Sequence, residues 1–312
     1  MNAPAQDRLR SLTDQAKKLP PLSTAVVCPY DASSLEGADI AAKEGLIVPV
    51  LMGSASKIRA AAEKANISIS GYEIVDLAVS DREVANQACA LARSGKVGAL
   101  MKGSLHTDDL LGAIVDKNTG LRTNRRMTHI FVMDVPTYKW PLLISDAALN
   151  VAPDLNTKKS ICQNAIYLAQ DLGVAEPKVA VLAAVEVVNP DMSCTLDAAA
   201  LSKMADRGQI TGGLVDGPLA FDNAVSMESV KIKGIKSPVA GQADILVAPD
   251  IEAGNMIYKQ LVYLANSGAA GIVLGASVPV MLTSRADTPA ARMASAALAV
   301  LSMAGQKARQ TK

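Results

Sequence analysis

The sequence has few aromatic residues and almost no net charge. Of its 312 residues, 2 are Phe, 1 is Trp and 6 are Tyr, and 31 Lys and Arg offset 30 Asp and Glu to leave a net charge of +1. Proteins that bind nucleic acids usually carry a basic face or aromatic stacking platforms. We therefore expect no nucleic acid among the partners of this protein.

Motifs for metals and tightly bound cofactors are also missing. The two histidines, His106 and His129, belong to no HExxH or His/Cys pattern, and the four cysteines form no CxxC pair. No GxGxxG follows a strand-like segment, and no GxSxG occurs. We therefore expect no metal site and no tightly bound cofactor, and we interpret the cysteines as small core residues.

Long apolar runs are absent as well. The two longest, 269–283 and 293–305, fall short of the roughly 20 residues that a membrane-spanning helix needs. The first twenty residues mix acidic and basic side chains and lack the apolar stretch of a secretory signal. We therefore expect a cytoplasmic protein with no membrane partner.

Short β-branched runs alternate with helix-like segments along almost the whole chain. Strand-like runs such as 24–28, 47–52 and 97–101 are separated by helix-like segments such as 35–44 and 82–92. This alternation is typical of α/β proteins with mainly parallel sheets. Because the chain is longer than one typical core, we expect two α/β domains with an interdomain cleft.

The segment 102–107 follows a predicted strand and opens a predicted helix. Free backbone N–H groups at a helix N-terminus bind anions, and Lys102 adds a positive charge there. An ordinary strand-to-helix turn, with Ser104 or Thr107 as the N-cap, is the alternative.

The segment 282–289 has the same arrangement ahead of the last helix. Thr288 followed by Pro289 predicts the start of that helix, because hydroxyl N-caps and proline at the first helical position are both favoured. Ser284 and Arg285 come just before this positive helix end and form the best phosphate candidate among the loops. A capping segment with an exposed arginine is the alternative.

Three arginines, Arg122, Arg125 and Arg126, lie within five residues. Guanidinium groups suit phosphate oxygens, although a solvated turn explains the cluster equally well. Two more predicted strand ends carry Asn150 and Asn255. Open α/β sheets bind ligands at such ends, but Asx turns are the alternative.

Several of these segments, in this order, resemble the phosphate acetyltransferase and phosphate butyryltransferase family. The runs are KGSLHT at 102–107, DAALNVAP at 146–153, VVNP at 187–190, GQITGGLVDGPLAFDN at 208–223, PDIEAGNMIY at 249–258 and LTSRAD at 282–287. They are most similar to the butyryltransferase branch and to the phosphate acyltransferase part of fused enoyl-CoA hydratase/phosphate acetyltransferase proteins.

The resemblance implies reversible transfer of an acyl group, expected to be acetyl or butyryl, between coenzyme A and inorganic phosphate. The products are an acyl phosphate and free CoA, formed by direct transfer in the cleft, with CoA as a substrate. It also implies a homodimer or larger homo-oligomer and an isocitrate/isopropylmalate dehydrogenase-like fold whose last helix returns to the first domain. We therefore expect one domain at 1–134 plus 276–312 and another at 135–275.

The resemblance also implies roles for site residues. Ser284 and Arg285 would stabilise the phosphate and the developing oxyanion. Asp287 is the candidate base, since Ala291 stands where acetyltransferases of the family carry an aspartate, although helix capping also suits Asp287. The substrate-binding candidates are Lys102, Ser104, His106, Thr107, Asn150 and Asn255, and the CoA-binding candidates, chosen by charge, are Arg122, Arg125 and Arg126.

Two other functions stay open from the sequence. A metal-dependent NAD(P) dehydrogenase could use the same fold, because a fold does not fix a function. A non-catalytic acyl-CoA binding protein would follow if loss of the base had removed turnover.

Overall fold

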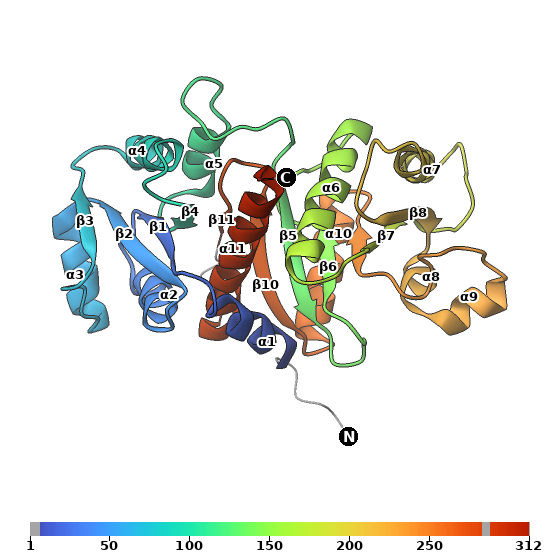
Figure 1. Cartoon of the computed structure of the whole chain (residues 1–312), viewed down its shortest axis with the longest axis horizontal. Helices are drawn as coiled ribbons and strands as arrows, with labels where there is room; N and C mark the ends of the chain where they lie inside the picture. Colours follow the sequence, from blue (N-terminus) through green and yellow to red (C-terminus); the bar gives the residue numbers. More distant parts are fainter. Residues whose placement is uncertain (1–6, 283–287, 312) are drawn as a thin grey trace. The chain divides into compact units, whose positions relative to one another are not determined.

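The computed structural model describes residues 7–282 and 288–311. The chain forms two compact units, each described by itself below. Unit 1 contains Arg126–Ala269 with the residues up to Arg8, and unit 2 contains Leu9–Arg125 with the residues from Ala270 onward. Both units alternate helices with strands (Figure 1).

Unit 2 contains a sheet with the strand order β3-β2-β1-β4-β11-β10. Its strands are β1 (Leu22–Val27), β2 (Ile47–Gly53), β3 (Glu73–Asp76), β4 (Ala99–Lys102), β10 (Gly268–Leu274) and β11 (Val280–Met281). Neighbours from β3 to β11 run parallel, whereas β10 and β11 pair antiparallel.

The helices of unit 2 cover both faces of its sheet. They are α1 (Asp7–Ala16, which belongs to unit 2 from Leu9 onward), α2 (Ala32–Lys43), α3 (Ala55–Ala65), α4 (Asp81–Arg93), α5 (Thr107–Val115) and α11 (Pro289–Gln310). The chain runs from β1 through β2 to β3 and then returns to β4, so right-handed crossovers place α2 and α3 on one face and α4 on the other. In agreement, α2 packs against α3 and α11, while α4 packs against α5.

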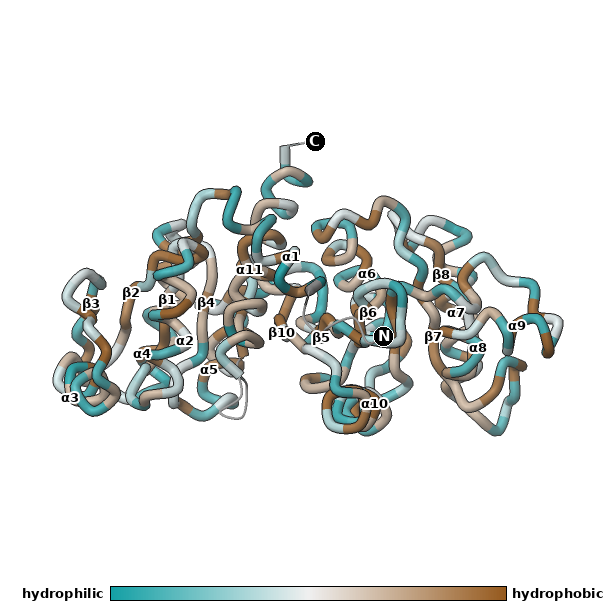
Figure 2. Tube along the Cα trace, turned by 90° about the horizontal axis from the view of Figure 1, so that it is seen from below, coloured by the Kyte–Doolittle hydropathy of each residue, from teal (hydrophilic) through white to brown (hydrophobic). Residues whose placement is uncertain are grey.

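Unit 1 has the strand order β5-β6-β9-β7-β8. The strands are β5 (Thr128–Asp134), β6 (Leu142–Ser145), β7 (Lys178–Leu182), β8 (Leu214–Leu219) and β9 (Ile245–Val247). β5 is antiparallel to β6, and the other pairs are parallel. The helices are α6 (Leu155–Asp171), α7 (Ser193–Asp206), α8 (Phe221–Val225), α9 (Met227–Lys233) and α10 (Ile251–Tyr263). Figure 2 shows α6 and α10 on opposite sides of β6.

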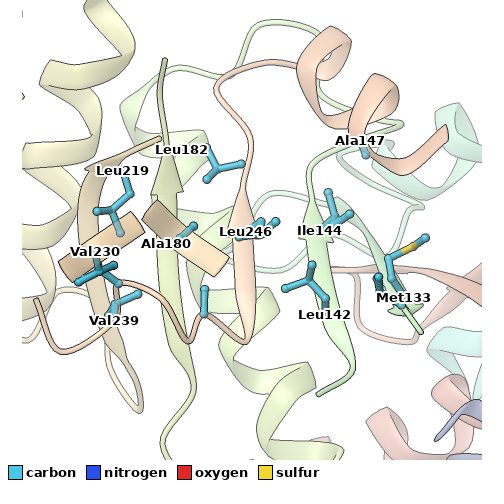
Figure 3. Packing of buried hydrophobic residues seen from close by; sticks show 14 residues of the cluster. Met133, Leu142, Ile144, Ala147, Ala180, Leu182, Leu219, Val230, Val239 and Leu246 are labelled. Carbon is cyan, nitrogen blue, oxygen red and sulfur yellow. The ribbon is translucent and has the colours of Figure 1, made fainter. Parts of the chain in front are cut away.

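The core of unit 1 is aliphatic and reaches the loop after β6. Ile144, Ala180 and Leu246 are fully buried on neighbouring strands (Figure 3). Full burial of a Leu or Ile side chain contributes roughly 1.5–3 kcal/mol. Ala147, two residues beyond β6, belongs to the same cluster. The core therefore anchors the first residues of a loop that carries polar side chains.

The predicted α/β class with mainly parallel strands is confirmed. Cys28, Cys89 and Cys162 are buried as predicted, whereas Cys194 is partly exposed. No helix in 7–282 or 288–311 is both long and apolar enough to cross a membrane.

Candidate active site

Two loops of unit 2 meet at the carboxyl ends of β1 and β4. The strands are parallel neighbours, and Val27 pairs in register with Lys102. β1 leads through α2 to β2 on one side, whereas β4 lies on its other side. Open α/β sheets bind ligands at such a topological switch point. The loops that follow Val27 and Lys102 are therefore placed to form a ligand site.

Glycine at position 103 allows these two loops to touch. The Gly103 N–H donates to the Val27 carbonyl at 2.9 Å. A Cβ atom at this position would overlap the backbone carbonyl oxygens of Val27 and Cys28. Because backbone atoms cannot swing away as a side chain can, a larger residue would push the loops apart.

The Cys28 carbonyl fixes the position of Ser104. It accepts hydrogen bonds from the Ser104 N–H at 2.8 Å, from the Ser104 hydroxyl at 2.9 Å and from the Tyr30 N–H at 2.9 Å. Cys28 itself has a left-handed backbone, with φ at 53°. The bend at Cys28 thus turns one carbonyl toward three donors and holds the half-buried Ser104 at the switch point.

The Cys28 thiol is not a nucleophile at neutral pH. Burial raises its pKa to about 12; a hydrogen bond with Tyr30 opposes the rise and the charge of Asp81 adds to it. The Sγ atom lies 3.6 Å from Asp81 Oδ1, which accepts its hydrogen. Since the thiolate is the reactive form of cysteine, this residue contributes geometry to the site.

The four predicted substrate residues of unit 2 come together in the turn from β4 into α5. The Lys102 ammonium donates to the Gly103 carbonyl at 3.2 Å. His106 is the N-cap residue of α5, its side chain makes no capping hydrogen bond, and both His106 and Thr107 are exposed. The first N–H groups of a helix have no intrahelical acceptor. Acidic residues in the first turn of α5 add negative charge beside these donors.

The three predicted CoA-binding arginines fall in different surroundings. Arg122 is exposed on a segment that bridges to Ala276, and Arg125 is half-buried in the same unit. Arg126 is exposed and belongs to unit 1. Hydrogen bonds from Thr157 lower the pKa of Asp154, and the charge of Arg126 contributes to this lowering.

A second pair of loops meets at the carboxyl ends of β6 and β9 in unit 1. Ser145 pairs in register with Val247, and the Ala248 N–H donates to the Ser145 carbonyl at 2.8 Å. The helices that follow these strands, α6 and α10, lie on opposite sides of β6 (Figure 2). The loop with Asn150 lies beside the start of α10, which carries Asn255, because the Ile251 N–H donates to the Val151 carbonyl at 3.1 Å.

Asp146 organises the loop after β6. Its carboxylate is almost completely buried, with 2% of the residue exposed. Oδ1 accepts the N–H groups of Ala148 and Leu149 at 3.0 and 2.9 Å. Oδ2 accepts from the His129 N–H at 3.2 Å and from Asn150 Nδ2 at 2.6 Å. Four donors thus saturate the carboxylate, which acts as the structural centre of this loop.

His129 lies across from Asp146 because of strand register. β5 pairs antiparallel with β6, and Ile130 is opposite Ser145. Burial lowers the pKa of His129 to about 4, while the charge of Asp146 opposes the lowering. The imidazole is therefore neutral at pH 7. Its Nδ1 atom is buried without a hydrogen-bond partner among the described residues.

The start of α10 packs directly on this loop. A Cβ atom at Gly254 would overlap the Asp146 carbonyl oxygen, so glycine permits the contact. Asn255 Nδ2 donates to the Ala147 carbonyl at 3.1 Å. Asp250 caps α10 by accepting the Ala253 N–H at 2.8 Å. These contacts bring Asn255, in the first turns of α10, next to the loop that carries Asn150.

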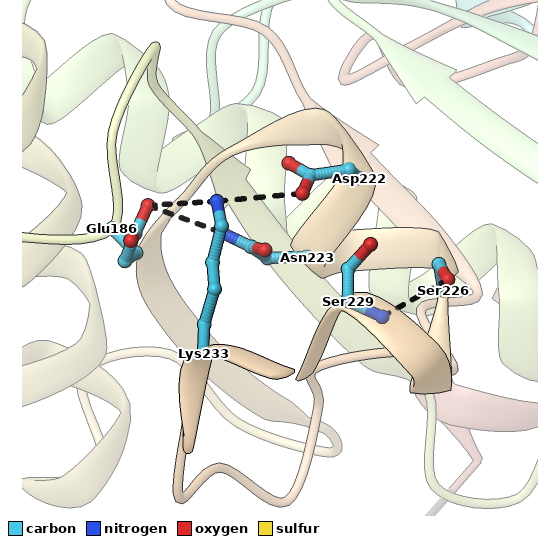
Figure 4. A network of polar contacts seen from close by, with 6 residues as sticks. All are labelled: Glu186, Asp222, Asn223, Ser226, Ser229 and Lys233. Carbon is cyan, nitrogen blue, oxygen red and sulfur yellow. Dashed lines mark hydrogen bonds and ion pairs between the residues drawn. The ribbon is translucent and has the colours of Figure 1, made fainter. Parts of the chain in front are cut away.

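A separate polar network joins the loop after β7 to α8 and α9 (Figure 4). Lys233 Nζ lies 3.3 Å from both Glu186 Oε2 and Asp222 Oδ2. Asn223 Nδ2 donates to Glu186 Oε2 at 3.2 Å. Each charge in this group already has a partner. We therefore interpret the segment GPLAFDN (217–223) as structural, because it links the loop after β7 to α8 and α9.

The predicted residues Ser284, Arg285 and Asp287 lie outside the described residues. The next residue, Thr288, is the N-cap of α11 as predicted, and its hydroxyl accepts the Ala291 N–H at 3.2 Å. Pro289 occupies the first turn, also as predicted.

Comparison with known proteins identifies the family. The model of the family described as "Phosphate acetyl/butaryl transferase" matches residues 79–300. The chain belongs to this family of acyltransferases. A phosphate acetyltransferase of Rhizobium meliloti is 51% identical over 308 residues, which cover 98% of this chain and 97% of the relative. A phosphate butyryltransferase of Clostridium beijerinckii is 40% identical over 296 residues, which cover 95% of this chain and 98% of the relative.

A solved structure of the same kind is also similar. The branched-chain phosphotransacylase from Enterococcus faecalis V583 is 28% identical and superposes with a TM-score of 0.79, over 90% of this chain and 99% of that chain. The family predicted from the sequence runs is thereby confirmed. The comparisons favour the transferase over the dehydrogenase alternative.

Three residues that shape the loops of this transferase were not predicted from the sequence. The Cys28 carbonyl accepts from Ser104, Asp81 accepts from the Cys28 thiol, and the His129 N–H donates to Asp146. Cys28 is the last residue of the first predicted strand, 24–28, so its strand-end position was the available signal. The registers that bring Cys28 to Ser104 and His129 to Asp146 follow from strand order, which the sequence does not reveal.

Proposed function

We propose that the protein is a phosphate acyltransferase that converts acyl-CoA and phosphate into acyl phosphate and CoA. A phosphate oxygen attacks the thioester carbonyl carbon, a tetrahedral intermediate forms, and the C–S bond breaks as CoA leaves and its sulfur gains a proton. The near full-length similarity to both acetyl and butyryl transferases carries this proposal. It makes acetyl and butyryl groups the first acyl chains to test.

The turn from β4 into α5 in unit 2 suits the anionic substrate. Lys102 and the first N–H groups of α5 supply positive charge and donors, and Ser104 is held rigidly beside them. Fixed donors lower the barrier because they need no reorganisation as the oxyanion develops. We propose that Ser104, His106 and Thr107 line the acyl phosphate pocket, with Ser284 and Arg285 as catalytic residues by resemblance and Asp287 as the candidate base.

Several finer features belong to the same proposal. By resemblance we infer an isocitrate/isopropylmalate dehydrogenase-like class and a homodimer or larger homo-oligomer. From their charge we infer that Arg122, Arg125 and Arg126 hold CoA phosphates, and we also infer a cytoplasmic location. The domain limits of 1–134 plus 276–312 and 135–275 likewise stay predictions.

An assay of free thiol tests the activity. The purified protein is mixed with acetyl-CoA or butyryl-CoA, with and without inorganic phosphate, and released CoA is followed with a thiol reagent. We expect release that depends on phosphate with at least one of the two acyl groups. Release that ignores phosphate, or none with either substrate, would contradict the proposal.

A further inference from the structure

The side-chain amide of Asn150 has one orientation. Its Nδ2 atom carries two hydrogens, and it donates one to Asp146 Oδ2 at 2.6 Å and the other to the Met127 carbonyl at 2.9 Å. Both partners are acceptors, so exchanging the nitrogen and oxygen positions would remove two hydrogen bonds. Oδ1 is therefore fixed on the other side of the amide.

The Oδ1 atom of Asn150 is left as an accessible acceptor. Asn150 is half-buried, and Oδ1 is not among the side-chain atoms that are buried without a partner. Within 7–282 and 288–311 no hydrogen bond reaches this oxygen. An amide oxygen accepts hydrogen bonds and cannot donate them. A ligand group that bonds to Oδ1 of Asn150 must therefore carry an N–H, O–H or S–H donor.

The surroundings of Asn150 disfavour an anion. The carboxylate of Asp146 lies directly behind its amide, and no cation is paired with that carboxylate among the described residues. On the neighbouring α10, Asn255 has also turned an N–H inward, to the Ala147 carbonyl. Phosphate near pH 7 presents mostly acceptor oxygens, which an amide oxygen and a carboxylate repel.

We propose that Oδ1 of Asn150 accepts a hydrogen bond from the pantetheine arm of CoA and that Asn150 is a specificity-determining residue for CoA, not a phosphate ligand. The inference rests on the proposed function, in which the substrates are phosphate and acyl-CoA. Of these two, the pantetheine arm offers neutral donors, namely its amide N–H groups and, in free CoA, the thiol. The loop after β6 would therefore bind the acyl-CoA substrate through Asn150.

Calorimetric titration with CoA tests this assignment without turnover. We expect Asn150→Ala to weaken CoA binding at least about fivefold, which is roughly 1 kcal/mol. Asn156→Ala is the matched control, because Asn156 is an exposed asparagine on α6 of the same unit and makes no described side-chain hydrogen bond. Its Kd for CoA should equal that of the wild type. An unchanged Kd in Asn150→Ala would overturn the proposal.

A second variant separates recognition from loop structure. Asp146→Asn disturbs the same loop but keeps Oδ1 of Asn150. In steady-state assays that start from acyl phosphate and CoA, we expect Asn150→Ala to raise the KM for CoA and leave the KM for acyl phosphate within twofold, whereas Asp146→Asn changes kcat and both KM values together. If the two variants show the same selective loss for CoA, or if Asn150→Ala raises both KM values equally, Asn150 acts only through the loop and the proposal fails.

Desulfo-CoA identifies the donor. A loss of affinity that persists with desulfo-CoA assigns the hydrogen bond to an amide N–H, and a loss confined to CoA assigns it to the thiol. A loss with neither ligand overturns the inference. Wild-type protein that binds CoA but forms no acyl phosphate would contradict the proposed function alone, because the Kd comparison does not require turnover.

Discussion

His129 occupies a position where a positive charge is unfavourable. The residue is 3% exposed, and its ring lies 4.3 Å from the ring of Phe131, centroid to centroid. Phe131 in turn stacks on Tyr258 of α10, with centroids 3.7 Å apart. Protonation would place a cation in these apolar surroundings, and the nearby charge of Asp146 offsets only part of the lost hydration.

Stability should therefore depend on pH through His129. In the unfolded chain a histidine titrates near 6.5, whereas in the folded protein burial lowers the pKa of His129 to about 4. Between these values the unfolded state binds more protons, so the free energy of unfolding falls as the pH falls from 6.5 to 4, by up to roughly 3 kcal/mol. Above pH 6.5 the imidazole is neutral in both states and contributes no pH dependence.

The variant His129→Phe should lose this part of the pH dependence. Urea unfolding at pH 7, 5.5 and 4 measures the free energy of unfolding of both proteins. The advantage of the wild type over the variant in this free energy should shrink or reverse toward pH 4. If the free energy of unfolding changes with pH in the same way in both proteins over this range, His129 does not titrate in the way its burial implies.

Two glycines on helices should respond in opposite ways to alanine. At Gly254 the new Cβ would meet the Asp146 carbonyl oxygen, which is backbone, so we expect Gly254→Ala to lower the free energy of unfolding by about 1–3 kcal/mol. At Gly112, within α5, the nearest atoms are the flexible end of Arg82. There we expect a gain of roughly 0.5–1 kcal/mol, because alanine favours helix.

Chemical denaturation of both variants gives the comparison. Each change replaces glycine with alanine inside a helix, so the helix preference is common to both and the difference reports the contact. If Gly254→Ala is as stable as Gly112→Ala, α10 does not press on the loop after β6 as the structure describes.

At the scale of single elements, the start of α11 depends on one hydroxyl. Thr288 accepts the Ala291 N–H and caps the long helix Pro289–Gln310, whose central residues are buried. We expect Thr288→Ala to cost about 0.5–2 kcal/mol, while Thr288→Ser, which keeps the hydroxyl, stays close to the wild type. Thermal unfolding of the three proteins checks this, and equal midpoints would argue against the cap.

Local sequence signals predicted those elements whose start or type depends on neighbouring residues. The cap and proline at 288–289 predicted the start of α11, and alternation of β-branched and helical segments predicted β1, β2 and β4. β11 has only two residues, too few to leave a pattern. The antiparallel pairing of β5 with β6 was also not predictable, because both strands are buried and read like members of a parallel sheet.

At the scale of the whole chain, each unit gathers polar residues at the ends of adjacent parallel strands. In unit 2 the ends of β1 and β4 offer donors and the Lys102 ammonium; in unit 1 the ends of β6 and β9 offer acceptors around Asp146. The sequence predicted which loops carry these residues. It could not predict that Asn150 presents an oxygen, because the amide orientation depends on Asp146 and Met127.

The transfer of the acyl group to phosphate is most directly tested by phosphorus NMR of a mixture of acyl-CoA, inorganic phosphate and the protein. Acyl phosphate should appear at the same rate as free thiol, with acetyl-CoA, butyryl-CoA or both, and added CoA should reverse the reaction. Thiol released without acyl phosphate, or no reaction with either thioester, would contradict the account.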